Sequence, residues 1–251
     1  MTISQLYFII NSMLKQALIS IMIWVASATL IIALFFAMLF FTIILFPFDK
    51  KRKAAHAQCF WWADAMVTMN PYWDISVSGL ENIDYNKAYV IVANHRSMAD
   101  IVPIYKTRMQ FKWVAKESLF NVPFIGWNMS LARHIKLERG KFSSIKKVYR
   151  EAAHWLRGGM SVLFFPEGTR SATDDMKDFQ NGAFKLAIKE RVPVLPMSIE
   201  GTGNTIPKGS WLFKTKVAGT IKVLPPIDTS RFGAADFAAL RDLTRSMLEA
   251  A

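Results

Sequence analysis

Hydrophobic residues make up almost all of one stretch near the start of the chain, residues 16–48, and none of these 33 positions is charged. A helix of that length would measure about 50 Å, well beyond the roughly 30 Å hydrocarbon thickness of a bilayer. We therefore predict a membrane anchor over residues 1–53, built as one tilted or bent helix or as two short helices. Residues 1–16 are predicted to form a short amphipathic piece at its start.

A cleaved signal peptide is the alternative interpretation of this stretch. The apolar region of a signal peptide is only about 7–15 residues long, whereas here the small residues at 26–28 are followed by more apolar sequence. The basic cluster DKKRK at 49–53 comes directly afterwards. Such clusters stay on the cytoplasmic side and contact anionic headgroups, so we expect the remainder of the chain to face the cytoplasm.

After residue 54 the pattern changes to short apolar or alternating segments separated by segments of helical period. The strand-like segments are 72–78, 88–93, 111–115, 133–137, 161–165, 194–199 and 216–223, and the last of these alternates as an edge strand would. The helix-like segments are 54–69, 97–107, 122–130, 143–157, 182–189 and 234–249. Alternating strands and helices predict an α/β domain over 54–251, with a mostly parallel sheet flanked by helices.

Two polar residues follow the buried strand predicted at 88–93. His95 lies at the end of this strand, and Asp100 comes five residues later. Within one helix these positions would lie about 140° apart, so they could not meet there. A helix that begins near Ser97 leaves His95 in the preceding turn, from which it can fold back onto Asp100. The carboxylate would then fix the tautomer and leave one ring nitrogen free to accept a proton.

A structural interpretation of the same residues stays open at this point. Ser97 and Asp100 have the spacing of a helix N-cap and its N3 partner, so Asp100 would only cap the helix. His95 alone could be a buried structural histidine. A second apolar strand that ends in a polar turn, FPEGTRS at 165–171, favours the functional interpretation.

Four motifs together resemble the 1-acylglycerol-3-phosphate (lysophosphatidic acid) acyltransferase family of glycerolipid acyltransferases. They are NHRSMAD at 94–100, which is similar to the family's His-x4-Asp signature, a looser IKLER at 135–139, FPEGTRS at 165–171 and VPVLP at 192–196. The resemblance covers residues 72–225 and is specific, because the four blocks occur in the family's order.

The resemblance implies that a membrane-bound enzyme of phospholipid biosynthesis transfers an acyl group to the sn-2 hydroxyl of 1-acylglycerol 3-phosphate, giving phosphatidic acid. The donor is acyl-CoA or acyl carrier protein, no cofactor takes part, and no covalent acyl-enzyme forms. His95 would act as the general base and Asp100 would orient it.

The phosphate of the lysolipid needs cations and backbone donors. Arg170 is the first candidate, with Lys116 and Arg139 next, because all three follow predicted strands. Gly168 would let the backbone approach closely and Thr169 adds a hydroxyl. We expect Glu167 to contact a glycerol hydroxyl or to pair with an arginine.

The charge of the chain is strongly basic, with 31 Lys and Arg against 19 Asp and Glu, and residues 1–48 contribute only Lys15. Such a surface suits nucleic acid, anionic lipid or an acidic protein. The apolar stretch and the absence of a nucleic-acid-binding module favour a membrane surface over nucleic acid. An acidic acyl carrier protein would suit the basic surface, but so would anionic lipid. The single cysteine, Cys59, excludes an intrachain disulfide, and the four histidines show no paired spacing of metal ligands.

Two alternatives to this function remain at the level of sequence. The acceptor could be another lysolipid, such as a lysophospholipid or lyso-ornithine lipid. The chain could also be a membrane-anchored lipid-binding protein without catalytic activity. A hydrolase is disfavoured because the sequence has no Gly-x-Ser-x-Gly motif.

Overall fold

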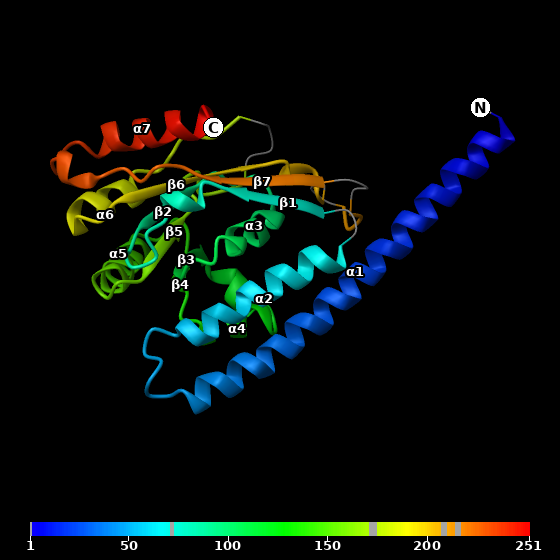
Figure 1. Cartoon of the computed structure of the whole chain (residues 1–251), viewed down its shortest axis with the longest axis horizontal. Coiled ribbons are helices and arrows are strands. Elements are labelled where there is room, and N and C mark those ends of the chain that lie inside the picture. Colours follow the sequence, from blue (N-terminus) through cyan, green and yellow to red (C-terminus); the bar gives the residue numbers. More distant parts are fainter. Residues whose placement is uncertain (1, 71–72, 171–174, 207–209, 214–216) are drawn as a thin grey trace.

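A seven-stranded sheet in the order β1-β7-β6-β2-β5-β3-β4 forms the centre of the computed structural model, which describes residues 2–70, 73–170, 175–206, 210–213 and 217–251 (Figure 1). All neighbouring strands are parallel except β6 and β7. The strands are β1 (Trp73–Ser78), β2 (Val90–Ala93), β3 (Phe111–Lys116), β4 (Ile135–Leu137), β5 (Ser161–Phe164), β6 (Val194–Glu200) and β7 (Val217–Val223). The predicted α/β class with a mostly parallel sheet is confirmed, although Tyr72 and Lys216, the first residues of two predicted strands, lie outside the described residues.

Helices cover both faces of this sheet (Figure 1). They are α1 (Ile3–Ile44), α2 (Lys53–Met69), α3 (Ile101–Lys106), α4 (Ile125–Leu131), α5 (Phe142–Arg157), α6 (Gly182–Glu190) and α7 (Phe237–Glu249). Alternate residues of β2 enter two different cores. Val90 and Val92 pack with α5, α6 and α7, whereas Ile91 and Ala93 pack with α2 and α3. Burial on both faces explains why β2 is continuously apolar.

The prediction that the last strand lies at an edge of the sheet is wrong. β7 pairs with β1 on one side and with β6 on the other, and the two edges are β1 and β4. Its residues nevertheless alternate between buried and exposed. One face of β7 is therefore covered and the other faces solvent, and this one-sided burial produced the alternation that resembled an edge.

Helix α1 is a single continuous helix of 42 residues. It begins at a capping box formed by Thr2 and Gln5, so residues 2–16 do not form a separate piece and the apolar stretch is not divided into two helices. Met1, the first residue of that predicted piece, lies outside the described residues. Its second half packs on α2 and α4, where the ring of Phe35 lies 5.4 Å from that of Trp127. The N-terminal end of α1 extends beyond the remainder of the chain (Figure 1). Most large apolar side chains of α1 are exposed.

Three polar side chains of α1 bind a short segment that follows β6. Gln16 Nε2 donates to the carbonyl of Phe213 at 2.7 Å, and Ser20 Oγ accepts from the N–H of the same residue at 3.0 Å. Trp24 Nε1 donates to the carbonyl of Trp211 at 2.8 Å. The three positions are four residues apart and therefore share one face of the helix. These contacts explain why polar side chains interrupt an otherwise apolar helix.

Lys112 on β3 is fully buried and joins three parts of the fold. Its Nζ donates to the carbonyls of Lys51 at 2.8 Å and Ala132 at 2.7 Å, and it lies 4.6 Å from the centre of the Trp155 ring. Burial lowers the pKa of Lys112 from 10.5 to about 7. The side chain thus connects the segment after α1 to the turn before β4.

This lowered pKa makes the stability of the protein depend on pH. In the unfolded chain Lys112 keeps its proton up to its ordinary pKa near 10.5, whereas the folded protein begins to lose it near 7. The unfolded state then binds more protons between these values, so the free energy of unfolding contributed by Lys112 should rise with pH. We expect denaturation in detergent to show a smaller rise between pH 7 and 9 for Lys112→Met than for the wild type. The exposed Lys189→Met is the control, and an equal rise in both variants would contradict this account.

Candidate active site

Most of the polar residues singled out in the sequence lie at one edge of the sheet. Strands β2, β5, β3 and β4 are neighbours and parallel, so their carboxyl ends share this edge. His95 follows β2, Glu167 and Arg170 follow β5, Lys116 ends β3, and Arg139 follows β4. Open α/β sheets bind ligands at the carboxyl ends of their strands, which makes this edge the candidate site.

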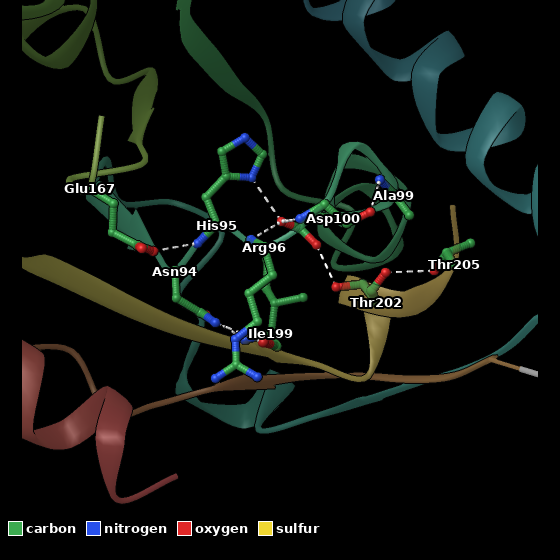
Figure 2. Close-up of polar contacts among 10 residues, drawn as sticks. Asn94, His95, Arg96, Ala99, Asp100, Glu167, Ile199, Thr202 and Thr205 are labelled. Atoms are coloured by element: carbon green, nitrogen blue, oxygen red, sulfur yellow. Dashed lines mark hydrogen bonds and ion pairs between the residues drawn. The ribbon is translucent and has the colours of Figure 1, made fainter. Parts of the chain in front are cut away.

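His95 and Asp100 are in direct contact. Nδ1 of His95 lies 2.8 Å from Oδ2 of Asp100 (Figure 2). Ser97 caps the 3-10 turn Met98–Asp100 that precedes α3, and the same Oδ2 also accepts the N–H groups of Arg96 at 2.8 Å and Ser97 at 2.9 Å. Asp100 therefore caps the helix and holds the histidine at once, so the structural and functional interpretations are compatible.

The contact determines the tautomer of His95. A buried carboxylate accepts hydrogen bonds, so Nδ1 carries the hydrogen and Nε2 keeps its lone pair. Within the described residues Nε2 has no hydrogen-bond partner, and Figure 2 shows it facing away from Asp100. The His95 side chain is 19% exposed, while that of Asp100 is fully buried. Phe165 stacks on the imidazole at 3.9 Å. The arrangement suits a group that takes a proton from a ligand.

Glu167 connects the loop after β5 to the loop after β2. Its Oε1 accepts the N–H of His95 at 2.7 Å, and its Oε2 accepts the N–H of Lys177 at 3.2 Å. The side chain is only 6% exposed. Among the described residues its hydrogen-bond partners are these two backbone groups, and not the arginine that the sequence analysis allowed. Glu167 fixes the position of the histidine backbone.

The turn after β5 presents its remaining polar groups to solvent. Gly168 has a φ of +71°, a conformation that favours glycine, and no atom lies within 4 Å of where its Cβ would be. Thr169 and Arg170 are exposed. Lys177 Nζ donates to Thr169 Oγ1 at 2.9 Å and to the carbonyl of Arg170 at 2.8 Å, so this turn carries a second cation. Ser171 lies outside the described residues.

Lys116 and Arg139 are exposed at the same edge of the sheet. Neither side chain has an ion pair or hydrogen bond to any of the described residues. In the strand order β2-β5-β3-β4, Arg139 follows the strand farthest from His95 and Lys116 ends the one before it. Of the three predicted cations, Arg170 therefore follows the strand nearest to His95, because β5 pairs directly with β2.

Three residues of the site were not singled out by the sequence. Thr202 Oγ1 donates to Asp100 Oδ1 across 102 positions of the chain. The amide of Asn94 donates to the carbonyl of Ile199 at 2.8 Å and accepts its N–H at 2.7 Å, which joins the end of β2 to β6 (Figure 2). Lys177 is the third. Asn94 adjoins the histidine and could have been noticed, but no local pattern marks Thr202 or Lys177. In the described ranges, no group of three or more His, Cys, Asp or Glu side chains is placed to hold a metal ion.

Comparisons with known proteins match this region. A family model described as Acyltransferase matches residues 74–200. The chain is 37% identical over 212 residues to a 1-acyl-sn-glycerol-3-phosphate acyltransferase of Chlamydomonas reinhardtii, with 82% of this chain and 63% of that protein covered. It is 35% identical over 185 residues to a chloroplastic enzyme of the same name from Arabidopsis thaliana, with 73% and 51% covered. The chain thus spans about half to two thirds of the length of these curated relatives.

A solved structure is similar over nearly the whole chain. It is the 1-acyl-sn-glycerophosphate (LPA) acyltransferase PlsC of Thermotoga maritima, with a TM-score of 0.79 and 27% sequence identity. The match covers 94% of this chain and 95% of the solved one. Since only 6% of this chain lies outside the match, the similarity extends over the greater part of α1 as well as the sheet.

Proposed function

Because this chain belongs to the acyltransferase family, we propose that it transfers a fatty acyl group from an acyl thioester to the sn-2 hydroxyl of 1-acylglycerol 3-phosphate, giving phosphatidic acid. The names of the most similar relatives support this acceptor. The contact between His95 and Asp100, with Nε2 left available, is the observation that carries the proposal.

The proposed reaction needs one base that returns its proton. Nε2 of His95 accepts the proton of the lysolipid hydroxyl while the hydroxyl oxygen attacks the thioester carbonyl carbon. The new C–O bond forms, the C–S bond breaks, and the leaving thiolate takes the proton from the imidazolium. Asp100 stabilises that imidazolium as a buried anion at 2.8 Å. A histidine suits both halves of this cycle because its ordinary pKa lies near neutral pH.

The phosphate of the acceptor is proposed to bind at the turn after β5. Arg170 and Lys177 supply positive charge there, and Gly168 lets the backbone approach closely. Lys116 and Arg139 extend this basic edge along β3 and β4. Thr169 offers its hydroxyl beside Lys177. In this proposal Glu167 acts by holding the loops together.

We also propose that α1 binds the protein to a membrane, with the catalytic domain on the cytoplasmic side. The helix is apolar and long enough to cross a bilayer, and only 11% of its most hydrophobic window is buried. Lys50, Lys51 and Lys53 follow it with exposed side chains and would contact anionic headgroups. The donor is acyl-CoA or an acidic acyl carrier protein, and no cofactor is needed. The basic surface would suit the carrier protein.

A panel of donors and acceptors with the purified full chain tests the proposed reaction. Acyl-CoA and acyl carrier protein are each combined with 1-acylglycerol 3-phosphate, a lysophospholipid and lyso-ornithine lipid, and thiol release and lipid product are measured. We expect transfer to 1-acylglycerol 3-phosphate at the highest kcat/KM. Transfer only to another lysolipid would overturn the proposed acceptor. Binding of lysolipid without turnover of any pair would identify a lipid-binding protein instead.

A further inference from the structure

Thr202 completes the set of hydrogen bonds around the carboxylate of Asp100. It begins the 3-10 turn Thr202–Asn204 that follows β6, and its hydroxyl donates to Oδ1 (Figure 2). The other oxygen, Oδ2, receives Nδ1 of His95 and two backbone N–H groups. Thr202 is 1% exposed and Asp100 is 0% exposed. Within the described ranges, Thr202 is thus the sole donor to Oδ1.

The strands β6 and β7 hold Thr202 in place. Its carbonyl accepts Oγ1 of Thr205 at 2.7 Å and the N–H of Thr205 at 3.0 Å. Gly201, directly before it, has a φ of +73°, and a Cβ at that position would lie 1.7 Å from the carbonyl oxygen of Ala218 on β7. The chain therefore turns sharply and without a side chain just before Thr202. This turn brings the hydroxyl to the carboxyl ends of β2 and β6, where Asp100 lies.

A buried carboxylate oxygen without a donor is costly. Without the Thr202 hydroxyl, Oδ1 would be such an oxygen, and rotation of the carboxylate would move Oδ2 away from His95. We propose that Thr202 is a positioning residue that fixes the rotation of the Asp100 carboxylate and so holds Oδ2 against Nδ1 of His95. This inference rests on the proposed function, because it assigns Thr202 a part in the same proton transfer.

Removal of the hydroxyl should weaken the contact between Asp100 and His95. A carboxylate whose Oδ1 has lost its donor can rotate, so Oδ2 moves away from Nδ1 and stabilises the imidazolium less. The acid limb of the pH profile of activity should then move to lower pH. The other charged groups beside the pair are Glu167, which accepts the His95 N–H at 2.7 Å, and Arg96, whose guanidinium points away from the carboxylate in Figure 2. Both are unchanged in a Thr202 variant, so a shift reports the hydroxyl itself.

The test compares Thr202→Val, which keeps the shape and removes the hydroxyl, with Thr202→Ser, which keeps the hydroxyl. In Thr202→Val we expect kcat to fall by about tenfold or more, with KM for the acceptor within about twofold, and the acid limb of the pH profile to move to lower pH. Thr202→Ser should stay within about threefold of the wild type. A loss of folded protein alone would lower the apparent kcat without moving the limb.

A second readout does not need turnover. NMR of the histidine side chains in the full chain, with the His95 signals assigned through His95→Gln, reports the hydrogen bond from the Nδ1–H of His95 to Oδ2 of Asp100 in each variant. Loss or an upfield shift of the Nδ1–H signal in Thr202→Val, restored in Thr202→Ser, would support the inference. An unchanged signal in Thr202→Val, or a serine variant that behaves like valine, would overturn it. Absence of transfer in the wild type would count against the proposed function, while the NMR comparison would still decide the role of Thr202.

Discussion

Replacing His95 with alanine is expected to lower kcat for acyl transfer by about 10³-fold or more, because the substitution removes the group that accepts the hydroxyl proton. Water can take over only inefficiently at this site. The substitution removes the stacking of the imidazole on Phe165, whose ring centre lies 3.9 Å away. It keeps the hydrogen bond from the backbone N–H of His95 to Glu167, which should hold the two loops together. The KM for the acceptor should change far less than kcat, since the proposed phosphate contacts come from other residues.

The measurement is steady-state thiol release at saturating donor, with product lipid identified in the same samples. His154→Ala is the matched control, because His154 is an exposed histidine on α5 and lies outside the candidate site. The control should retain wild-type activity. If His95→Ala kept activity within about tenfold of the wild type while remaining folded, a mechanism with His95 as the base would have to be abandoned.

Asp100→Asn is expected to lower kcat by about 10³-fold, through loss of charge with little change of shape. The backbone N–H groups of Arg96 and Ser97 would hold the amide oxygen where Oδ2 now lies, so Nδ1 of His95 would keep its partner. The imidazolium formed during the reaction would then face a neutral amide. Its formation would therefore cost more free energy.

The sign of the pH effect distinguishes this variant from a general loss of structure. Weaker stabilisation of the imidazolium moves the acid limb of the kcat/KM profile of Asp100→Asn to lower pH, in the same direction as expected for Thr202→Val. Asp178→Asn changes a fully exposed carboxylate and should leave the profile unchanged. A profile of Asp100→Asn that matched the wild type in both height and position would show that the carboxylate does not assist the base.

The elements of the sheet could be predicted because each one buries a face with a simple period. β2 is apolar throughout because it packs on helices at both faces, and α5 shows helical spacing because it buries one side. The position of a strand within the sheet could not be predicted in this way. The residues of β7 alternate between buried and exposed because only one face of the strand is covered, and this period does not show which strands pair with β7.

The site was predictable where its parts are close in sequence. His95 and Asp100 are five residues apart at the junction of a strand and a helix, so local geometry limits how they can meet. Thr202 reaches the same carboxylate only because β6 lies beside β2 in the sheet, and strand order cannot be read from one sequence. Glu167 was recognised by its motif, but its backbone partners depend on the same strand order.

The hydrogen bonds of Gln16, Ser20 and Trp24 with residues 211–213 limit how α1 can move in the proposed membrane-bound enzyme. The three contacts extend over about 12 Å of α1, so the helix cannot slide lengthwise past the catalytic domain as a loosely tethered anchor could. A mismatch with thicker or thinner lipid must then be met by tilting or sinking the whole molecule. The height of His95 above the lipid, and with it access to the acceptor, should vary with the acyl-chain length of the surrounding bilayer.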